Sequence, residues 1–285
     1  MPELPEVETI RRIIEPQILK QIIISAAVFN PQVVAYPEAE EFTELLTGQT
    51  VKSMSRRGKF LTVHFESEDR LCLHLRMTGQ LLVTPTDFPE VKHTHLISDL
   101  SNGSQIRYID QRRFGRFWYL KAGEEDTVTG QNKLGPEPLD DELTWKYLKE
   151  KFGKRKKAIK EMLHDQSIIA GIGNIYSDEI LYAAKIYPGE KCLDLADTDW
   201  KRLAEKIPEI ISWGIDVNKM TPEQYLAGMG KEYSNMEYFN AYGREGKPCR
   251  KCGTTMERIV IGGRGSCFCP KCQKKKRKDT TGNLL

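Results

Sequence analysis

Apolar and polar residues alternate along much of the first 120 residues. The clearest case is 71–77, where every second side chain up to Met77 is apolar, which is typical of a strand with one buried face. Shorter strands are predicted at 60–65, 94–100 and 105–109. One helix is predicted before them, over 5–19, and Pro16 should end it early. The pattern therefore favours an antiparallel β-sandwich in this part of the chain.

The spacing becomes helical in the second half. Helices are predicted at 143–152, 156–164, 174–184 and 199–213. Residues 135–138, with one glycine and two prolines, oppose both helix and strand and predict a linker. Glycines precede Asn174, the expected N-cap of its helix. A helix start of this kind suits a phosphate, although a tight turn between helices would use the same glycines.

Four cysteines near the C-terminus form two matched pairs. Each pair has two intervening residues, and sixteen residues separate the pairs: Cys249, Cys252, Cys269 and Cys272. This spacing is typical of a structural Zn²⁺ site, since four thiolates complete a tetrahedron. Disulfides or free core thiols are the alternatives, but disulfides are rare inside cells and core thiols need no such pairing. Cys267 lies two residues before Cys269 and is interpreted as a bystander.

Positive charge is concentrated around these cysteines. From residue 243 to the C-terminus there are twelve Lys or Arg and three Asp or Glu, whereas the rest of the chain carries a net charge of −6. Lysines and arginines also cluster at 151–160. Such patches suit a nucleic-acid backbone, because binding releases counterions, although a basic run alone is more often a solvated tail.

The 285 residues allow about two domains. The N-terminus is acidic, unlike a signal peptide, and the most apolar stretch, 22–29, is too short to span a bilayer. We therefore expect a cytoplasmic protein without a membrane partner.

The N-terminus offers a candidate nucleophile. Removal of the initiator methionine would leave Pro2 as a secondary amine, and α-amines titrate near pH 8. Attack of such an amine on a sugar aldehyde carbon gives an iminium, which favours elimination, and the adjacent Glu3 could move protons. An N-terminal proline is by default only a rigid chain start.

Seven motifs, in order along the chain, resemble the bacterial formamidopyrimidine-DNA glycosylases (Fpg), which are relatives of endonuclease VIII. They are PELPEVET at 2–9, RRGKFL at 56–61, HLRMTG at 74–79, RRFG at 112–115, LGPEPL at 134–139, GIGNIY at 171–176, and YGR at 242–244 with the four cysteines. Leu4 points to the Fpg branch, because endonuclease VIII proteins usually carry glycine there.

The resemblance implies an α+β protein in four parts. These are an N-terminal catalytic β-sandwich domain at 1–133, a helix–two-turn–helix domain at 139–240, a β-hairpin zinc finger at 241–275 and a basic tail at 276–285. The implied protein is a monomeric bacterial enzyme of base excision repair, associated with the nucleoid when bound to DNA. It would excise oxidised or ring-opened purines and cut the strand by β,δ-elimination.

The resemblance also implies roles for individual residues. Pro2 is expected to form the Schiff base, Glu3 to act as general acid/base, Lys59 to lie beside the lesion sugar, and Glu6 to support the active site. The expected DNA contacts are His93, Arg112, Lys160, Asn174 and Arg264.

Met77, Arg112 and Phe114 match the residues that fill the gap left by a flipped nucleotide in this family. Arg112 should face the orphaned base, where its forked donors suit cytosine. For Met77 the strand pattern by itself favours a core position instead.

Residues 215–235 depart from the family pattern. The family usually carries a glycine-rich loop that closes over the flipped base, whereas 221–226 predict a capped helical turn. We therefore expect a weaker preference for 8-oxoguanine. Two other classes remain: a catalytically inactive or abasic-site-directed protein of the same fold that binds damaged DNA, and a zinc-ribbon transcription or translation factor.

Overall fold

The computed structural model describes residues 2–230 and 237–276, which form two compact units. The first comprises 2–133 with 218–230, and the second comprises 134–217 with 237–276. The first continuous stretch of the first unit ends at residue 133, which is also where the predicted N-terminal domain ends. The first unit also includes 218–230, which the sequence analysis had assigned to the helical domain.

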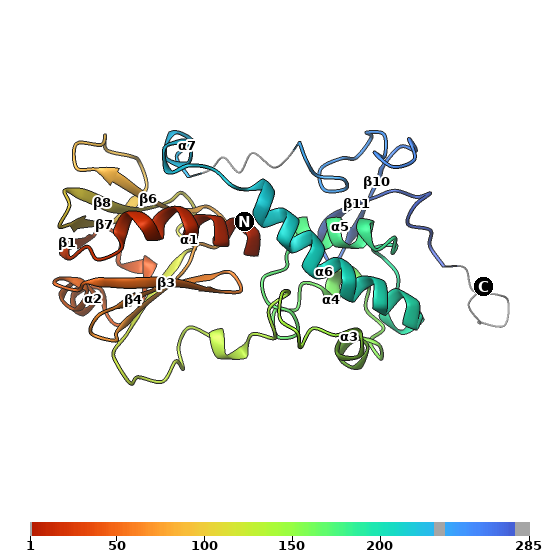
Figure 1. The fold of residues 1–285 in the computed structure, drawn as a ribbon, viewed down its shortest axis with the longest axis horizontal. Helices are drawn as coiled ribbons and strands as arrows, with labels where there is room; N and C mark the ends of the chain where they lie inside the picture. The colour runs from red at the N-terminus through yellow and green to blue at the C-terminus, as the bar shows by residue number, and fades with distance from the viewer. Residues whose placement is uncertain (1, 231–236, 277–285) are drawn as a thin grey trace. The chain divides into compact units, whose positions relative to one another are not determined.

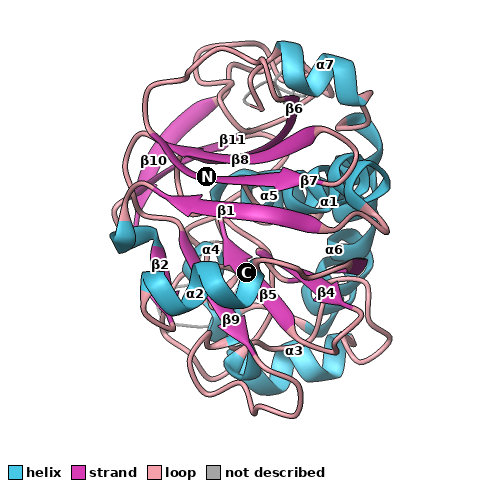
Figure 2. Ribbon diagram, turned by 90° about the vertical axis from the view of Figure 1, so that its left-hand side faces the viewer, coloured by secondary structure: helices cyan, strands magenta, loops and turns pink. Residues whose placement is uncertain are grey.

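Two β-sheets form the centre of the first unit (Figure 2). One has the strand order β1 (Ile23–Val28), β7 (Thr94–Leu100), β8 (Ser104–Asp110) and β6 (Gly79–Pro85). The other has the order β2 (Val34–Tyr36), β9 (Arg116–Leu120), β5 (Arg70–His74), β4 (Phe60–Phe65) and β3 (Val51–Arg57). The short β2 runs parallel to β9, and the other described pairs are antiparallel. One hydrophobic core contains side chains from both sheets, which confirms the predicted α+β class.

Helices cover this core. Val7, Ile10 and Ile14 on α1 (Leu4–Ile18) are buried in it, and α2 (Ala39–Leu46) adds Phe42. The prediction that Pro16 ends α1 early was wrong. Pro16 lies in the last turn, so it removes one helical hydrogen bond close to the end of the helix, and the helix continues to Ile18.

The predicted strand at 71–77 ends at His74, before Met77. Burial and the charges of Arg76 and Lys59 lower the pKa of His74 to about 3, so its ring is neutral. The Nδ1 atom of that ring accepts a hydrogen bond from the Arg76 N–H at 3.0 Å, and Arg76 has a positive φ of 56°. The chain therefore turns here, and the apolar alternation beyond His74 does not mark a strand.

The second unit is mostly helical (Figure 1). Its helices are α3 (Trp145–Phe152), α4 (Ile159–Met162), α5 (Asn174–Ala183) and α6 (Asp197–Val217), and its hairpin consists of β10 (Glu257–Ile261) and β11 (Arg264–Phe268). Short 3-10 helices occur in the first unit at η1 (Pro31–Val33) and η2 (Gln131–Lys133), and in the second at η3 (Cys192–Asp194). None of the helices in the described part of the chain is long and apolar enough to cross a bilayer.

The predicted linker at 135–138 packs against the turn between α4 and α5. The N–H of Gly135 donates to the Gln166 carbonyl at 2.9 Å, and the Ala170 N–H donates to the Pro136 carbonyl at 3.0 Å. A Cβ atom on Gly135 would come within 2.4 Å of the Ile168 backbone. This close approach explains the glycine, and it makes the segment a packed connection.

The divergent segment forms α7 (Pro222–Ala227), as the capping pattern predicted. The N–H of Thr221 donates to Gln224 Oε1 at 2.9 Å, and Thr221 Oγ1 accepts from the Gln224 N–H at 3.3 Å. Tyr225 is buried in the core of the first unit, and its hydroxyl donates to the Leu81 carbonyl at 3.1 Å. Residues 231–235 of the predicted divergent loop lie outside the described residues.

Candidate active site

Two buried carboxylates stand at the start of α1. Glu3 and Glu6 are each only 2% exposed, and half-buried Pro2 directly precedes them. The backbone N–H of Glu3 donates to Glu6 Oε2 at 2.8 Å, and Asn218 Nδ2 donates to Glu6 Oε1 at 3.1 Å. Glu6 therefore fixes the direction in which the N-terminus leaves the helix, consistent with its expected supporting role.

Sequence reasoning missed Asn218. It is fully buried, and it belongs to the segment whose pattern departs from the family. Nothing in the local sequence pairs it with Glu6, which lies 212 positions earlier in the chain. The divergent segment therefore supports the Glu6 carboxylate, independently of any role in binding a flipped base.

Lys59 occupies the two-residue turn between β3 and β4 and is almost buried. Its neighbour Gly58 has a positive φ of 56°, which glycine adopts without strain. The guanidinium of Arg56 donates to the Gly58 carbonyl at 3.2 Å and lies 3.3 Å from Glu8 Oε2 on α1. The ion pair between Arg56 and Glu8 thus connects the Lys59 turn to the helix that carries Glu3.

Glu8 stays ionised at any ordinary working pH. Burial alone would raise its pKa, but hydrogen bonds from Arg11 and Arg12 and the charges of Arg11 and Arg56 lower the pKa from 4.5 to about 2. The carboxylate form is therefore favoured by folding, and its stabilising effect is present above pH 4.5 and is lost as the pH falls toward 2.

Glu8→Gln is expected to destabilise the protein by roughly 2–3 kcal/mol at pH 7, because the arginines lose their shared counter-ion. The difference from wild type should narrow progressively below pH 4.5, as Glu8 becomes protonated in the unfolded wild-type chain. Urea unfolding between pH 7 and pH 3 measures this gap. The exposed Glu44→Gln is the control and should show no gap. A gap that stays constant with pH would contradict this account.

The three expected intercalating residues lie on two exposed loops of the first unit. Met77 is 42% exposed in the turn between β5 and β6, so the core position that the strand pattern favoured is wrong. Phe114 is 46% exposed between β8 and β9, and the Arg112 guanidinium lies 4.6 Å from the centre of its ring. His93, the other expected contact in this unit, is partly exposed just before β7.

In the second unit, Asn174 is the first residue of α5, and Gly173 is the N-cap in place of Asn174. The turn before it is organised by Gln166, whose Oε1 accepts from the Gly171 N–H at 2.8 Å and whose Nε2 donates to the Ile172 carbonyl at 2.7 Å. The buried Oδ1 atom of Asn174 has no hydrogen-bond partner among the described residues. Buried polar atoms are usually satisfied, so the amide is suited to a ligand.

The structure argues against the expected direct DNA contact of Lys160. Its side chain is only 1% exposed, and its ammonium forms a salt bridge with Asp178 and donates to the Asn174 carbonyl at 3.2 Å. A buried ammonium needs a counter-ion close by, and Asp178 supplies it. Lys160 is therefore placed to hold the start of α5.

The four cysteines expected to bind zinc come together in the second unit. Their sulfur atoms all lie within 4.8 Å of one another, which fits a tetrahedron with Zn–S bonds of about 2.3 Å. Cys267 is not in this group, as predicted. Tyr182 Oη lies 3.2 Å from Cys249 Sγ, close enough to donate a hydrogen bond to a metal-bound thiolate.

Arg264 stands exposed at the tip of the hairpin that these cysteines stabilise. It begins β11 and pairs with Ile261 across a two-residue turn formed by Gly262 and Gly263. Both glycines have positive φ, 54° and 76°, as the commonest tight hairpin turn requires.

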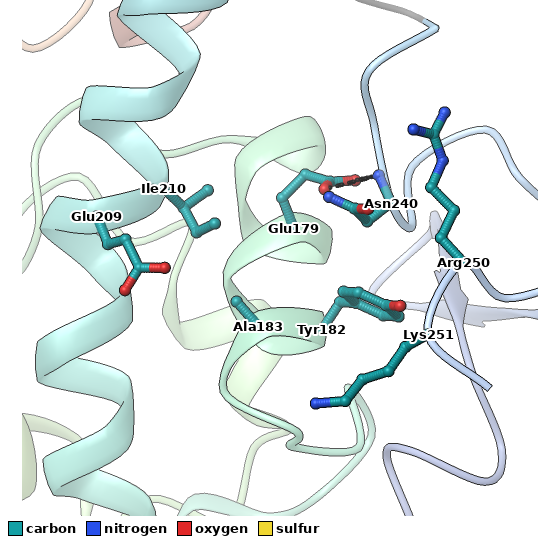
Figure 3. A pocket seen from close by; sticks show the side chains of 8 residues that line it. All are labelled: Glu179, Tyr182, Ala183, Glu209, Ile210, Asn240, Arg250 and Lys251. Atoms are coloured by element: carbon teal, nitrogen blue, oxygen red, sulfur yellow. Dashed lines mark hydrogen bonds between the residues drawn. The ribbon is translucent and has the colours of Figure 1, made fainter.

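Two consecutive carboxylates of α5, Asp178 and Glu179, hold the zinc-binding part of the unit, and sequence reasoning missed both. Asp178 accepts hydrogen bonds from Ser266 Oγ and, at 3.0 Å, from the Cys267 N–H of β11. Glu179 accepts from the backbone N–H groups of residues 240–242 at 2.8–3.2 Å, one of which is drawn in Figure 3. Burial raises the pKa of both carboxyls, and these hydrogen bonds offset that rise only in part.

Beside Glu179 lies an open pocket of about 320 Å³ (Figure 3). It is lined by residues of α5, α6 and the segment 240–251, among them Tyr182, Glu209 and Lys251. None of the expected catalytic residues contributes to it. We therefore assign this pocket no part in the chemistry expected from the sequence.

Comparisons with known proteins agree along most of the chain. Residues 1–117 match the model of the formamidopyrimidine-DNA glycosylase N-terminal domain, 134–226 match the H2TH domain of the same enzymes, and 246–275 match the zinc finger found in FPG and IleRS. The formamidopyrimidine-DNA glycosylase of Desulforamulus reducens is 42% identical over 97% of this chain and 100% of its own length. The Bacillus subtilis enzyme of the same name is 40% identical with the same coverage.

Solved structures of DNA complexes are similar as well. Lactococcus lactis Fpg bound to DNA with an abasic site has a TM-score of 0.85 and 36% identity, covering 96% of this chain and all of that one. A complex of MutM with DNA that contains carbocyclic 8-oxo-G has a TM-score of 0.85, 37% identity and the same coverage.

Proposed function

The chain belongs to the formamidopyrimidine-DNA glycosylase family, and we propose that it removes damaged bases from DNA and then cuts the strand. The observation that carries this proposal is the start of α1, where Pro2 precedes two buried carboxylates, Glu3 and Glu6, and Asn218 holds the second of them in place. A protein that only bound DNA would have no need of this arrangement. Oxidised or ring-opened purines, formamidopyrimidines above all, are the proposed substrates.

Pro2 is proposed to supply the nucleophile. Its nitrogen forms a bond to C1′ of the damaged nucleotide as the bond from C1′ to the base breaks, and the departing base takes up a proton. Glu3 is proposed to give a proton to the ring oxygen as the sugar opens, and the amine loses its own proton to form the iminium. The positive charge then acidifies C2′–H, so that loss of this proton expels the 3′ phosphate.

The second elimination expels the 5′ phosphate in the same way and completes the β,δ-elimination. Lys59 is proposed to stabilise the negative charge of the sugar phosphates during both steps, since its turn is held to α1 by the ion pair between Arg56 and Glu8. These steps need no group from outside the chain.

Binding of damaged double-stranded DNA is proposed to use residues of both units. Asn174 and Arg264 would hold backbone phosphates, and His93 would add a further contact. Met77, Arg112 and Phe114 would fill the gap left by the flipped nucleotide. The zinc ion has a structural role, because four sulfur ligands leave no open position for a substrate. We expect a monomer in the bacterial cytoplasm that is associated with the nucleoid when bound to DNA.

Borohydride trapping tests the proposed chemistry. Reduction of the iminium by borohydride should link the purified protein covalently to DNA that contains an abasic site. A catalytically inactive DNA-binding protein of the same fold would bind this DNA without linkage. A zinc-ribbon transcription or translation factor would show neither linkage nor preference for the damaged duplex. Absence of linkage would contradict the proposed function.

Preference for 8-oxoguanine over a ring-opened purine is expected to be weaker than in typical family members. The reason is α7, a capped helix packed into the core, in a segment where the family usually carries a glycine-rich loop. Single-turnover excision from matched duplexes with each lesion opposite cytosine measures the preference. Equal rates for the two lesions would show that this segment does not decide specificity.

A further inference from the structure

The two loops that carry the exposed side chains of Met77 and Phe114 are joined at their bases by one buried carboxylate. Asp110, the fully buried last residue of β8, accepts hydrogen bonds from the backbone N–H groups of Gly115 at 2.9 Å and Arg112 at 3.1 Å. It also accepts one from Thr78 Oγ1 in the other loop. The same carboxylate thus fixes both loops.

Thr78 forms a second connection. Its Oγ1 donates to Asp110 and accepts a hydrogen bond from the Arg112 N–H at 3.1 Å. The pairing of β6 with β8 aligns Gly79 with Asp110, so the residue before Gly79 arrives beside this carboxylate. Both hydrogen bonds of the Thr78 hydroxyl therefore go to the loop that carries Phe114 or to its base.

Close packing leaves the loops little freedom at this point. A Cβ atom on Gly79 would lie 2.7 Å from Tyr108 Oη, and one on Gly115 would lie 1.7 Å from the same oxygen. That hydroxyl donates to Asp110 at 3.0 Å. Although burial alone would raise the pKa of Asp110, the hydrogen bonds from Thr78, Gly115, Tyr108 and Arg112 lower it, so the carboxylate remains an acceptor at neutral pH.

We propose that Thr78 and Asp110 are positioning residues that make the two loops a single wedge, so that Met77 enters the DNA stack together with Arg112 and Phe114. This inference rests on the proposed function. A rigid wedge loses less conformational freedom on entering the helix than two loops that must each be ordered. The Thr78 bridge therefore matters when a base must leave an intact stack, and much less when there is no stack to open.

Thr78→Val removes the bridge with little change in shape, and Thr78→Ser keeps the hydroxyl. Thr84→Val is the matched control, because Thr84 is a buried threonine of β6 whose hydroxyl has no partner among the described residues. We expect Thr78→Val to lower single-turnover excision from duplex DNA at least tenfold, whereas Thr78→Ser and Thr84→Val stay within twofold of wild type. Trapping on a single-stranded abasic oligonucleotide should fall less than twofold in Thr78→Val.

Coupling between the loops is measured by double-mutant cycles. In the wild-type background, the combined effect of Met77→Ala and Phe114→Ala on the duplex excision rate should differ at least threefold from the product of the single effects. In the Thr78→Val background the two effects should multiply. The proposal would be overturned if the effects of Met77→Ala and Phe114→Ala multiplied in both backgrounds. It would also be overturned if Thr78→Val and Thr84→Val had the same duplex excision rate. An equal loss of duplex and single-stranded activity in Thr78→Val would do the same, because it would indicate damage to the active site.

The same proposal can be tested without catalysis. A 2-aminopurine placed beside a non-reactive abasic analogue becomes fluorescent when it is unstacked, so it reports entry of the wedge. Thr78→Val should slow this signal at least fivefold relative to Thr84→Val, and an unchanged signal would overturn the coupling. Failure of the wild type to trap on any abasic DNA would contradict the proposed function alone, since the fluorescence would still report on the wedge.

Discussion

Pro2→Gly is expected to reduce base excision and strand cleavage on the order of a thousandfold, with little change in DNA affinity. The secondary amine of proline gives an iminium that stays cationic without a proton, whereas the primary amine of glycine gives an imine that must first be protonated. Glycine is also more flexible than proline, so the N-terminal amine would no longer be held in one direction before Glu3, whose N–H donates to Glu6. Single-turnover cleavage of lesion duplexes and fluorescence anisotropy with uncleaved DNA measure the two effects.

The control for this change is Pro85→Gly. Pro85 is an exposed proline at the end of β6, and its replacement should leave excision at the wild-type rate. The mechanism requires that the initiator methionine is removed, and the mass of the purified protein tests this. A Pro2→Gly enzyme that cleaves as fast as the wild type would eliminate Pro2 as the nucleophile.

Cys252→Ser is expected to release the zinc ion and to weaken DNA binding roughly a hundredfold, more than the loss of one phosphate contact explains. The hairpin is small, and its fold depends on the metal because the four sulfurs hold residues 249–272 together. Without the metal, β11 cannot present Arg264 in a fixed position. Metal analysis of the purified variant and anisotropy with duplex DNA measure the two losses.

Cys267→Ser is the control that distinguishes loss of a zinc ligand from the loss of any cysteine in this region. Cys267 is buried two residues before Cys269, and its backbone N–H donates to Asp178, a bond that the substitution preserves. The variant should retain zinc and DNA affinity. Loss of zinc from Cys267→Ser would mean that the four assigned ligands are wrong. Arg264→Ala, with the metal in place, gives the effect of losing the arginine contact alone.

Much of the fold was predictable because its signals are local. The strands at 60–65 and 94–100 agree with β4 and β7 at both ends, since short apolar runs bounded by turn residues mark strands locally. The zinc ligands were predictable for a similar reason, because closely spaced pairs of cysteines are a local signal of a metal site. The capped turn at residue 221 likewise depends on side chains three positions apart.

The errors arose where distant residues decide the outcome. The alternation up to Met77 indicated a strand, but a hydrogen bond to the ring of a buried neutral histidine turns the chain after His74 and exposes Met77. Lys160 was expected to meet DNA as one of a basic cluster. Its ammonium is buried instead, because Asp178 on the next helix provides a counter-ion.

The sequence by itself determined the family, the α+β class and the zinc ligands, because each of these is encoded by short motifs or by the spacing of neighbouring residues. Only the tertiary structure decided which polar groups support the proposed chemistry. The pairing of Asn218 with Glu6 joins positions 212 residues apart, and Thr78 meets Asp110 only because β6 and β8 pair in one register. A hydrogen bond between distant residues requires the fold to bring the two atoms together, and a single sequence carries no local signal of that.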